Sequence, residues 1–585
     1  MEATYIGRRA ARSGMVLGII LAGYLMFAVD TSIVNVALPT LRSALHFSTV
    51  GLSWVVNAYM LAYGGLLFLG GRSGDIVGRR RSLVFGIGLF TAASALGGLA
   101  PSGAWLIAAR VLQGLGAAFA APSTMALLVT SFPEGPARNR ALSTYSASAS
   151  LGAIIGLVLG GALTQWLSWR WVFFVNVPIG LALLALAPRF LPETERREGR
   201  FDLPGAVTGT AAVAVLVHGM IRAASNGWGD PFVIGSLTAA AALLTFFIRH
   251  ERTTKESLLP LHLFADRNRI GAYFGFLLII AGNYGTFFFA TQFLQRVLGF
   301  SPVQTGLAYV PLAATILVTV RIVPRLLTMW SPRALLLAGT PMQAASLFWL
   351  SRLSPTSGYL DGILGPMVLL GLAAGLCVMP LNATALAGVE RKEAGAASGL
   401  AQTMMIVGGS LGLSILVTIF GSTTRTGAVP TSLFAHSVTT TLSVAAGFAA
   451  TAFLVALFVL RAPLRVHQAV KAEANKNVVR RYLEMWNTGN VEKVHEILHP
   501  QWRDHAHQEI RSAGDVPAVL LKERADAPDF HIGVETIVSE GDRVAVHSTI
   551  RRTLNGNPQV SRVMWLVRIE GDKMAEMWTA LEQSA

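Results

Sequence analysis

Charged residues and cysteine are both scarce in this sequence. Charged side chains make up 14% of the 585 residues, whereas soluble domains carry about 25%. With 53% hydrophobic residues and a positive mean hydropathy, the composition excludes an ordinary soluble protein and indicates a polytopic membrane protein. The single cysteine, Cys377, excludes an internal disulfide, and its apolar surroundings argue against redox chemistry.

Acidic residues are particularly rare in the first four fifths of the chain. Residues up to Arg465 contain 32 Lys and Arg against 15 Asp and Glu, whereas the remainder contains 15 against 17. The chain therefore combines two physically different parts. We expect a membrane domain over residues 1–465, a linker over 466–470 and a small soluble domain over 471–585.

Fourteen apolar segments are candidates to cross the ~30 Å hydrocarbon core as helices. With the N-terminus inside, about 25 Lys and Arg fall in cytoplasmic loops or ends and six in outer loops. This asymmetry predicts that both termini are cytoplasmic, and it accounts for the basic excess without a nucleic-acid partner. No cleavable signal peptide is expected. The segments lie near 14–38, 51–71, 82–100, 103–131, 141–166, 171–191, 203–221, 232–249, 270–294, 304–327, 333–351, 360–380, 395–420 and 437–460.

Asp30 lies well inside the first apolar segment. A carboxylate there costs at least ~2.5 kcal/mol on the mildest insertion scales, so we interpret it as a protonatable site facing an internal cavity rather than a polar helix end facing headgroups. Arg110 in the fourth segment lies at a similar depth, which permits pairing with Asp30; the alternative is that it snorkels outward. Gln113 follows one turn later on nearly the same face.

The loop after the second segment reads GRSGDIVGRRR over residues 71–81. Its acidic residue can pair with a cation or cap a helix, and its arginines can hold the loop at the cytoplasmic surface. A generic positive-inside loop would explain the arginines alone. The spacing closely resembles the loop signature of the major facilitator superfamily, where it latches the cytoplasmic side between states, and this resemblance assigns the latch to Gly71, Asp75, Gly78, Arg79 and Arg80.

The fifth segment carries a stripe of glycines. Gly152, Gly156 and Gly160 recur every four residues, with Gly161 adjacent, so another helix can approach closely. Packing alone could explain them. The run also resembles the antiporter signature of drug exporters, with Leu157 at the position where that signature usually has a helix-kinking proline.

A longer resemblance covers about residues 1–465. The string WRWVFFVNVPIG at 169–180, the stretch around Asp30 and FDLPG at 201–205 are similar to the fourteen-helix drug:proton antiporter family. The resemblance implies a major facilitator fold in which helices 7 and 8, about 203–249, are inserted between two six-helix halves. It also implies proton coupling through Asp30 and Arg110, driven by the proton gradient without a cofactor.

Aromatic and amide side chains in the ninth segment form a candidate substrate pocket. They could line a broad apolar pocket suited to hydrophobic drugs, or they could face lipid or the packed core. With Gln113 from the fourth segment, the pocket candidates are Asn283, Tyr284, Phe288 and Gln292.

After residue 470 the pattern becomes that of a small α+β cone. Helical spacing predicts helices near 473–487, 490–498 and 514–526. Alternation and turn residues predict strands near 531–539, 542–553, 560–570 and 573–580.

The string RYLEMWNTGN at 481–490, followed by Asp504 and His505, resembles the SnoaL-like polyketide cyclase family, which has the nuclear-transport-factor-like fold. The resemblance implies a tail pocket that includes Trp486, His505, Trp565 and Trp578. It also makes His505 and Glu582 candidate catalytic groups, with Glu582 standing where the family has aspartate. We favour a ligand-binding tail over an enzyme because the chain ends three residues later. The spacing of His495, His499, His505 and His507 completes no metal site, so no metal is expected.

These patterns predict an all-α polytopic protein of the cell membrane with fourteen helices and a C-terminal α+β cone. We interpret it as a monomeric, proton-coupled exporter of hydrophobic drugs or antibiotic-like small molecules, with a cytoplasmic tail able to self-associate. The alternatives are uptake or facilitated transport of a metabolite by the same fold, or a transporter fused to an active cyclase-type enzyme.

Overall fold

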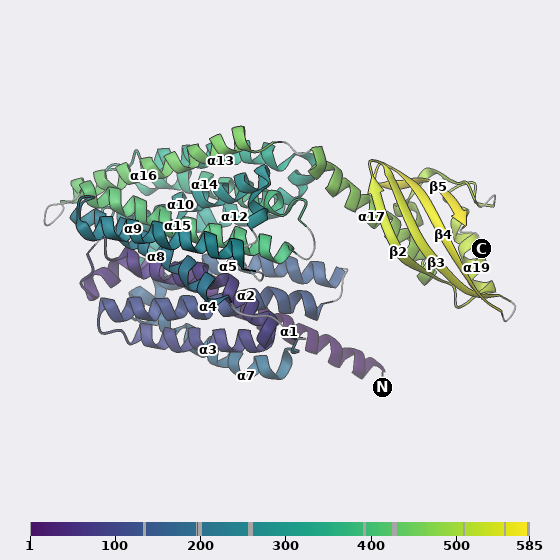
Figure 1. Cartoon of the computed structure of the whole chain (residues 1–585), viewed down its shortest axis with the longest axis horizontal. Helices are drawn as coiled ribbons and strands as arrows, with labels where there is room; N and C mark the ends of the chain where they lie inside the picture. Colours follow the sequence, from purple (N-terminus) through teal and green to yellow (C-terminus); the bar gives the residue numbers. More distant parts are fainter. Residues whose placement is uncertain are drawn as a thin grey trace. The chain divides into compact units, whose positions relative to one another are not determined.

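The computed structural model divides into two compact units, Met1–Arg461 and Ala462–Ala585 (Figure 1). It describes residues 2–581 apart from 49, 133–135, 195, 197–201, 255–260, 390–392, 424–429, 462–463, 507–508 and 555–556. The predicted boundary lies four residues later than this division. Each unit has its own hydrophobic core.

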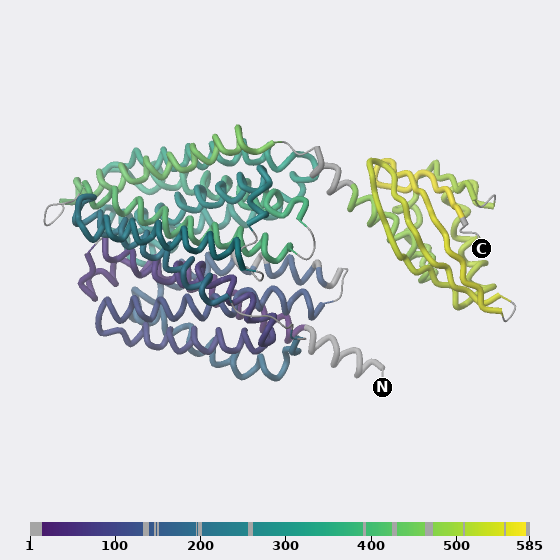
Figure 2. Tube along the Cα trace, viewed as in Figure 1, coloured from purple at the N-terminus to yellow at the C-terminus, as the bar shows by residue number. Residues whose placement is uncertain are grey.

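The described part of the first unit contains helices and no strand, and the trace in Figure 2 shows the long helices running beside one another. The elements are α1 (Glu2–Ala44), α2 (Ser53–Val77), α3 (Arg79–Gly98), α4 (Gly103–Ser131), α5 (Pro136–Trp166), α6 (Trp171–Phe174), α7 (Asn176–Phe190), α8 (Leu203–Asn226), α9 (Pro231–Thr253), η1 (Leu261–Phe264), α10 (Arg267–Arg296), α11 (Pro302–Ala308), α12 (Val310–Met329), α13 (Pro332–Leu350), η2 (Leu360–Leu364), α14 (Gly365–Leu386), α15 (Ala394–Thr423), α16 (Thr431–Leu454) and η3 (Val455–Val459).

Each of the fourteen predicted apolar segments overlaps one of these helices or two successive ones. Among the described residues, twelve helical stretches are long and apolar enough to cross a membrane. Helix α13 is not among them, and the apolar part of α5, Leu151–Trp166, is shorter. The helical membrane fold is confirmed, whereas the count of fourteen spans stays a prediction.

Glycines allow the helices of the first half to touch backbone to backbone. A Cβ on Gly70 of α2 would lie 1.9 Å from the carbonyl oxygen of Ala118 in α4, and one on Gly116 of α4 would lie 2.7 Å from that of Gly86 in α3. Any larger side chain there would force the helices apart. Helix α4 is therefore held tightly between α2 and α3.

The same device recurs in the second half, as expected for a repeated architecture. Gly408 and Gly412 of α15 would place a Cβ within 2.6 Å of backbone atoms of Leu277 and Ala281 in α10. This mirrors the glycine stripe through which α5 meets α1. The α10–α15 pair in the second half thus corresponds to the α1–α5 pair in the first.

Helix α8 packs along the line where α2 of the first half meets α15 of the second. A Cβ on Gly65 of α2 would lie 2.5 Å from Thr210 of α8, and Thr418 of α15 donates a 2.7 Å hydrogen bond to the carbonyl of Met220 in α8. Helix α9 packs on α8 and is largely exposed. The insertion of residues 203–249 between two six-helix halves stays a prediction.

The second unit is an α+β fold whose strands are ordered β1-β5-β4-β3-β2. Strand β1 pairs with β5 in parallel, and the other neighbours are antiparallel. The elements are α17 (Leu464–Thr488), α18 (Val494–Ile497), β1 (Leu498–Asp504), α19 (Val516–Asp526), β2 (His531–Glu540), β3 (Arg543–Leu554), β4 (Asn557–Glu570) and β5 (Lys573–Leu581).

Two details of this unit differ from the sequence-based prediction. Strand β1 was not predicted, because a seven-residue edge strand containing Pro500 has little alternation and pairs with β5 through an irregular register. Residues 466–470, predicted as a linker, lie within α17 because the helix begins at Leu464. The three helices and four remaining strands lie near their predicted positions.

Candidate functional site

A buried ion pair joins α1 to α4. The Nη1 atom of Arg110 lies 2.6 Å from Oδ2 of Asp30, and the two side chains are 2% and 0% exposed. A pair at this depth is stable only if further hydrogen bonds satisfy the remaining polar atoms. The sequence-based prediction brought these two residues to the same depth, and the structure places them in direct contact.

Two amides complete the surroundings of the carboxylate. Gln113 of α4 and Asn176 of α7 each donate a 3.0 Å hydrogen bond from the side-chain nitrogen to Oδ1 of Asp30. Gln113 also donates to Oγ of Ser94 in α3 at 2.8 Å, and its Oε1 accepts from Arg110 at 2.9 Å. Asp30 therefore accepts three hydrogen bonds, from Arg110, Gln113 and Asn176.

Arg110 is held by a fifth helix as well. Its Nε donates a 3.0 Å hydrogen bond to the carbonyl of Val55 in α2, and its guanidinium carbon lies 4.3 Å from the centre of the Tyr59 ring. Helices α1, α2, α3, α4 and α7, which lie together in the purple-to-blue part of Figure 1, thus meet at one polar cluster. We call Asp30, Ser94, Arg110, Gln113 and Asn176 the acid cluster.

A small cavity borders the acid cluster on the side of the second half. It offers about 10 Å³ of free space, roughly enough for one water molecule. Arg110 and Tyr59 of the first half and Tyr284 of α10 line it, together with Thr31, Val34, Val56 and Met60. Of the predicted substrate-pocket residues, Tyr284 is therefore the one that reaches the charged site across the contact between the halves.

The other pocket candidates are not gathered around this cavity. Gln113 belongs to the acid cluster, and Asn283 accepts a 3.0 Å hydrogen bond from Gln343 of α13. Phe288 is buried beside Phe289, and Gln292 donates to the carbonyl of Phe288. Their shared role in one substrate pocket stays a prediction.

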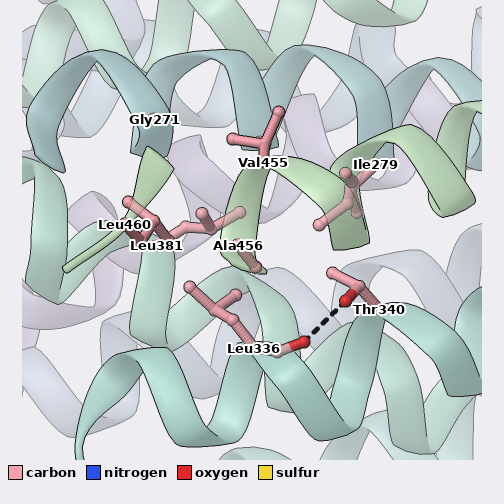
Figure 3. Close-up of a pocket in the computed structure, with 10 residues that line it drawn as sticks. Gly271, Ile279, Leu336, Thr340, Leu381, Val455, Ala456 and Leu460 are labelled. Atoms are coloured by element: carbon pink, nitrogen blue, oxygen red, sulfur yellow. Dashed lines mark hydrogen bonds between the residues drawn. The ribbon is translucent and has the colours of Figure 1, made fainter. Parts of the chain in front are cut away.

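A second pocket lies wholly within the second half (Figure 3). Its lining comes from α10, α13, α14, α16 and η3, and Figure 3 shows aliphatic side chains such as Leu336 and Leu381 around it. The hydroxyl of Thr340, which also lines the pocket, donates a 2.7 Å hydrogen bond to the carbonyl of Leu336. The pocket has no space for a water molecule, so it is packed core rather than a binding site.

The predicted glycine stripe of α5 lies directly against α1 beside Asp30. A Cβ on Gly156 would lie 2.0 Å from Oγ of Ser32 and 2.7 Å from the carbonyl of Val29. Gly152 and Gly160 lie equally close to α1, at Ala28 and Ile33. Gly161 instead meets the start of α11, 2.5 Å from the carbonyl of Pro302, so the same helix also contacts the second half.

The predicted latch loop is tied within the first half. Asp75 forms an ion pair with Arg79, whose guanidinium also donates to the carbonyl of Gly71 at 3.2 Å. The backbone nitrogen of Arg80 donates to Glu193, beyond the end of α7, at 3.1 Å. Gly78 has a φ of 113°, which favours glycine. Glu193 was missed because nothing in its local sequence marks it as a partner for this loop.

The predicted tail pocket divides between two faces of the sheet. Trp486 and Trp565 are buried in the core of the cone. Trp578 follows the buried Met577 and so points to the opposite face, where its ring stacks on His505 at 4.8 Å. The prediction that all four residues line one pocket is therefore wrong, because adjacent residues of β5 face opposite sides.

The stacked rings of His505 and Trp578 lie beside charged side chains on the exposed face of the sheet. Among the described residues, they do not lie beside a catalytic acid in the core. His505 lies 3.4 Å from Glu576, which also pairs with Arg568 at 2.7 Å. Arg568 lowers the pKa of Glu576 below its usual range, with His505 adding to the effect. The predicted Glu582 and His507 lie outside the described residues, and among the described residues no group of three potential metal ligands occurs.

The acid cluster contains residues that sequence reasoning did not select. Asn176 was visible as an amide in an apolar segment, but nothing indicated which way it faced. Ser94, and Tyr59 beside the cluster, gave no local signal, because small hydroxyls and tyrosines are common in packed helices.

Comparison with known families matches the two units separately. Residues 20–413 match the family model of the Major Facilitator Superfamily. Residues 479–577 match that of the SnoaL-like domain.

Several similar proteins are named for antibiotic export or resistance. A cephamycin export protein from Amycolatopsis lactamdurans is 42% identical over 74% of this chain and 90% of its own length. A puromycin resistance protein from Streptomyces alboniger is 41% identical over 69% and 81%. A tetracenomycin C resistance and export protein from Streptomyces glaucescens is 35% identical over 68% and 74%.

Among solved structures, a bacterial homologue of the human lysosomal transporter Spinster, in an inward-facing and occupied conformation, aligns with a TM-score of 0.55. It is 17% identical and covers 77% of this chain and 97% of its own. This likeness concerns the fold alone.

The ion pair predicts that substitutions of its two residues have non-additive effects on stability. Arg110→Met leaves the Asp30 carboxylate buried without a counter-charge and should cost about 3–5 kcal/mol. Adding Asp30→Asn should recover most of that loss. Thermal melting of the detergent-purified proteins measures the ranking, with Arg222→Met as control, because its pair with Asp230 is partly exposed and should contribute little to stability. Equal melting of the two single arginine variants would contradict the account.

The glycine stripe predicts a strong effect from a single methyl group. Gly156→Ala should destabilise the α1–α5 contact by about 1–3 kcal/mol, because the new Cβ overlaps the backbone of α1. Gly18→Ala in α1 is the matched control, since nothing lies within 4 Å of its Cβ position. The folded fraction in size-exclusion chromatography after mild heating compares the two, and an unchanged Gly156→Ala protein would show that α1 and α5 are not in close contact.

Proposed function

The chain belongs to the major facilitator superfamily, and we propose that it exports hydrophobic, antibiotic-like small molecules across the cell membrane in exchange for protons. The observation that carries the proposal is the acid cluster, in which the carboxylate of Asp30 is fully buried on a membrane-spanning helix. An ionisable residue in such a place marks a functional site. The names of the similar export and resistance proteins support the substrate class.

Asp30 is the proton carrier in this proposal. Its side chain is fully buried, and it accepts hydrogen bonds from Arg110 and the two amides. The proposed transport cycle alternates between the protonated and the ionised form of this side chain. Protonation weakens the pull of Asp30 on Arg110, which is the charge that faces the cavity at Tyr284.

This arrangement couples the proton to the contact between the two halves. Arg110 and Tyr59 belong to the first half and Tyr284 to the second, and they share one small cavity. The cavity has room for about one water molecule, so in this proposal the halves move apart here before a substrate meets the guanidinium and the tyrosine rings. Binding the substrate and holding the proton thus become competing events at one place, which is the physical requirement for exchange.

The proposal also includes the oligomeric state of the transporter, its orientation in the membrane and its partners. The transporter acts as a monomer in the bilayer, with both termini in the cytoplasm and protons and a small molecule as its partners. Uptake of a metabolite by the same fold is the alternative, since a fold does not determine direction.

The SnoaL-like tail serves as a ligand-binding module in this proposal. Its core contains an aromatic group in which the Tyr482 ring lies 5.8 Å from that of Trp502 and 6.2 Å from that of Trp486. The indole nitrogen of Trp502 and the hydroxyl of Ser548 are buried and have no hydrogen-bond partner among the described residues. Unsatisfied donors beside aromatic rings suit a flat ligand that carries carbonyl oxygens.

Replacement of the carboxylate should abolish export. In an exporter-deficient bacterium, the wild-type protein should lower the accumulation of dyes and antibiotics, and a protonophore should reverse this effect. Asp30→Asn should insert normally yet leave accumulation as high as in cells without the protein, because its side chain cannot exchange a proton. Asp361→Asn, which changes an exposed carboxylate, should behave as wild type.

Export by Asp30→Asn at the wild-type rate under a pH gradient would show that Asp30 does not couple the proton. If the wild-type protein exports none of the compounds, the drug assignment is wrong. Uptake or a narrow biosynthetic substrate then becomes the better proposal.

The tail should bind the exported compound without being needed for proton coupling. A chain truncated after Arg461 should keep protonophore-sensitive export. Residues 462–585 alone should melt at a higher temperature with the compound present, since a ligand at 100 times its Kd adds about 2.7 kcal/mol. Trp486→Ala should lose this increase, whereas Leu521→Ala, at an exposed helix position, should keep it. The absence of any increase would refute a ligand-binding tail.

A further inference from the structure

Asn176 has one polar atom that the rest of the acid cluster leaves unused. Its Nδ2 donates to Oδ1 of Asp30 at 3.0 Å, while its own Oδ1 is buried and has no hydrogen-bond partner among the described residues. Asn176 itself is completely buried. Buried acceptors are normally satisfied, so one that is not calls for an explanation.

The other two side chains that donate hydrogen bonds to Asp30 have no acceptor to spare. Arg110 has donors only. Gln113 uses both ends of its amide, because Oε1 accepts from Arg110 and Nε2 donates to Asp30 and Ser94. Turning the Gln113 amide round would break all three contacts. Turning the Asn176 amide round would break only its one hydrogen bond to Asp30.

This difference matters when Asp30 takes up a proton. The carboxylate is surrounded by donors from Arg110, Gln113 and Asn176, so the new O–H would point at N–H groups. An acid in that position needs an acceptor. A half-turn of the Asn176 amide about its last side-chain bond exchanges its nitrogen for its oxygen and supplies that acceptor.

We propose that Asn176 is a positioning residue whose amide turns with the protonation state of Asp30. In the ionised state its nitrogen donates to Oδ1 of Asp30, and in the protonated state its oxygen accepts the proton that Oδ1 now carries. One proton is added to Asp30 and no other bond forms or breaks. This inference rests on the proposed proton coupling at Asp30 and adds the means by which the buried acid is accommodated.

Among the remaining titratable groups near Asp30, Tyr59 also has a buried hydroxyl without a hydrogen-bond partner among the described residues, but Asn176 is the one of the two that already contacts Oδ1 of Asp30. Arg110 comes from α4 and Tyr59 from α2, with Tyr63 of α2 and Tyr284 of α10 next to Tyr59. The contributions of α3 and α7 to the cluster, Ser94 and Asn176, carry no charge. Because Oδ1 rather than Oδ2 carries the proton, the contact between Oδ2 and Arg110 is retained.

Acid-minus-base infrared difference spectra of the full-length protein in lipid vesicles test the proposal. The wild-type protein should show a carboxylic-acid carbonyl band that Asp30→Asn lacks. In Asn176→Leu this band should move to higher wavenumber, because the acid O–H has lost its acceptor. Asn35→Leu is the matched control: Asn35 is also buried, but its amide donates to the carbonyl of Thr31, so the band should stay in place.

A labelled wild-type protein keeps the test independent of the folding of Asn176→Leu. With carbon-13 in the asparagine side-chain carbonyl, one amide band should shift between the acid and base forms, and Asp30→Asn should abolish the shift. An acid band unchanged in Asn176→Leu, or no labelled amide shift in the wild type, would overturn the role of Asn176 alone. If the wild type shows no band that Asp30→Asn removes, the proposed proton coupling at Asp30 falls instead.

Discussion

A single carboxylate buried among apolar helices is the constraint on which the first half of this protein depends. An isolated charge there is too costly, so Asp30 needs a counter-charge and hydrogen-bond donors at close range. Arg110 supplies the charge at 2.6 Å, and Gln113 and Asn176 supply amides at 3.0 Å. Because these groups come from α1, α4 and α7, with α2 and α3 engaging Arg110 and Gln113, five helices are fixed relative to one another by a single acid. In the proposed function, their arrangement responds to whether that acid holds a proton.

Close packing holds the helices around the acid cluster firmly against one another. Glycines bring α5 against α1 beside Asp30 and bring α4 against α2 and α3, so the helices around the acid cluster have little slack. The cluster also borders the second half, since Arg110 and Tyr284 line the same cavity. In the proposed function, a change of charge at Asp30 acts on the contact between the two halves through this cavity. The chain, a multi-pass member of the major facilitator superfamily, ends in a SnoaL-like domain with a separate core.

The sequence predicted features that follow from composition and from the depth of a residue along its helix. It failed where the direction in which a side chain points decides the contact. Asp30 and Arg110 could be paired because counting residues along a helix gives depth. Asn176 could not be added, because helix rotation and crossing geometry decide which amide reaches Asp30. In the tail, the four longest strands alternate visibly, whereas β1 is short and pairs in parallel. Trp565 and Trp578 were assigned to one pocket, although the buried Met577 beside Trp578 shows that they face opposite sides.

The most direct test of proton coupling at Asp30 is proton release on substrate binding. An exported compound would be added to the purified protein in weakly buffered detergent solution, at a pH where the infrared titration shows Asp30 protonated. The account predicts that the wild-type protein releases protons in proportion to the bound compound, and that Asp30→Asn binds it without release. Equal release from both proteins would contradict the account, because the proton would then come from another group.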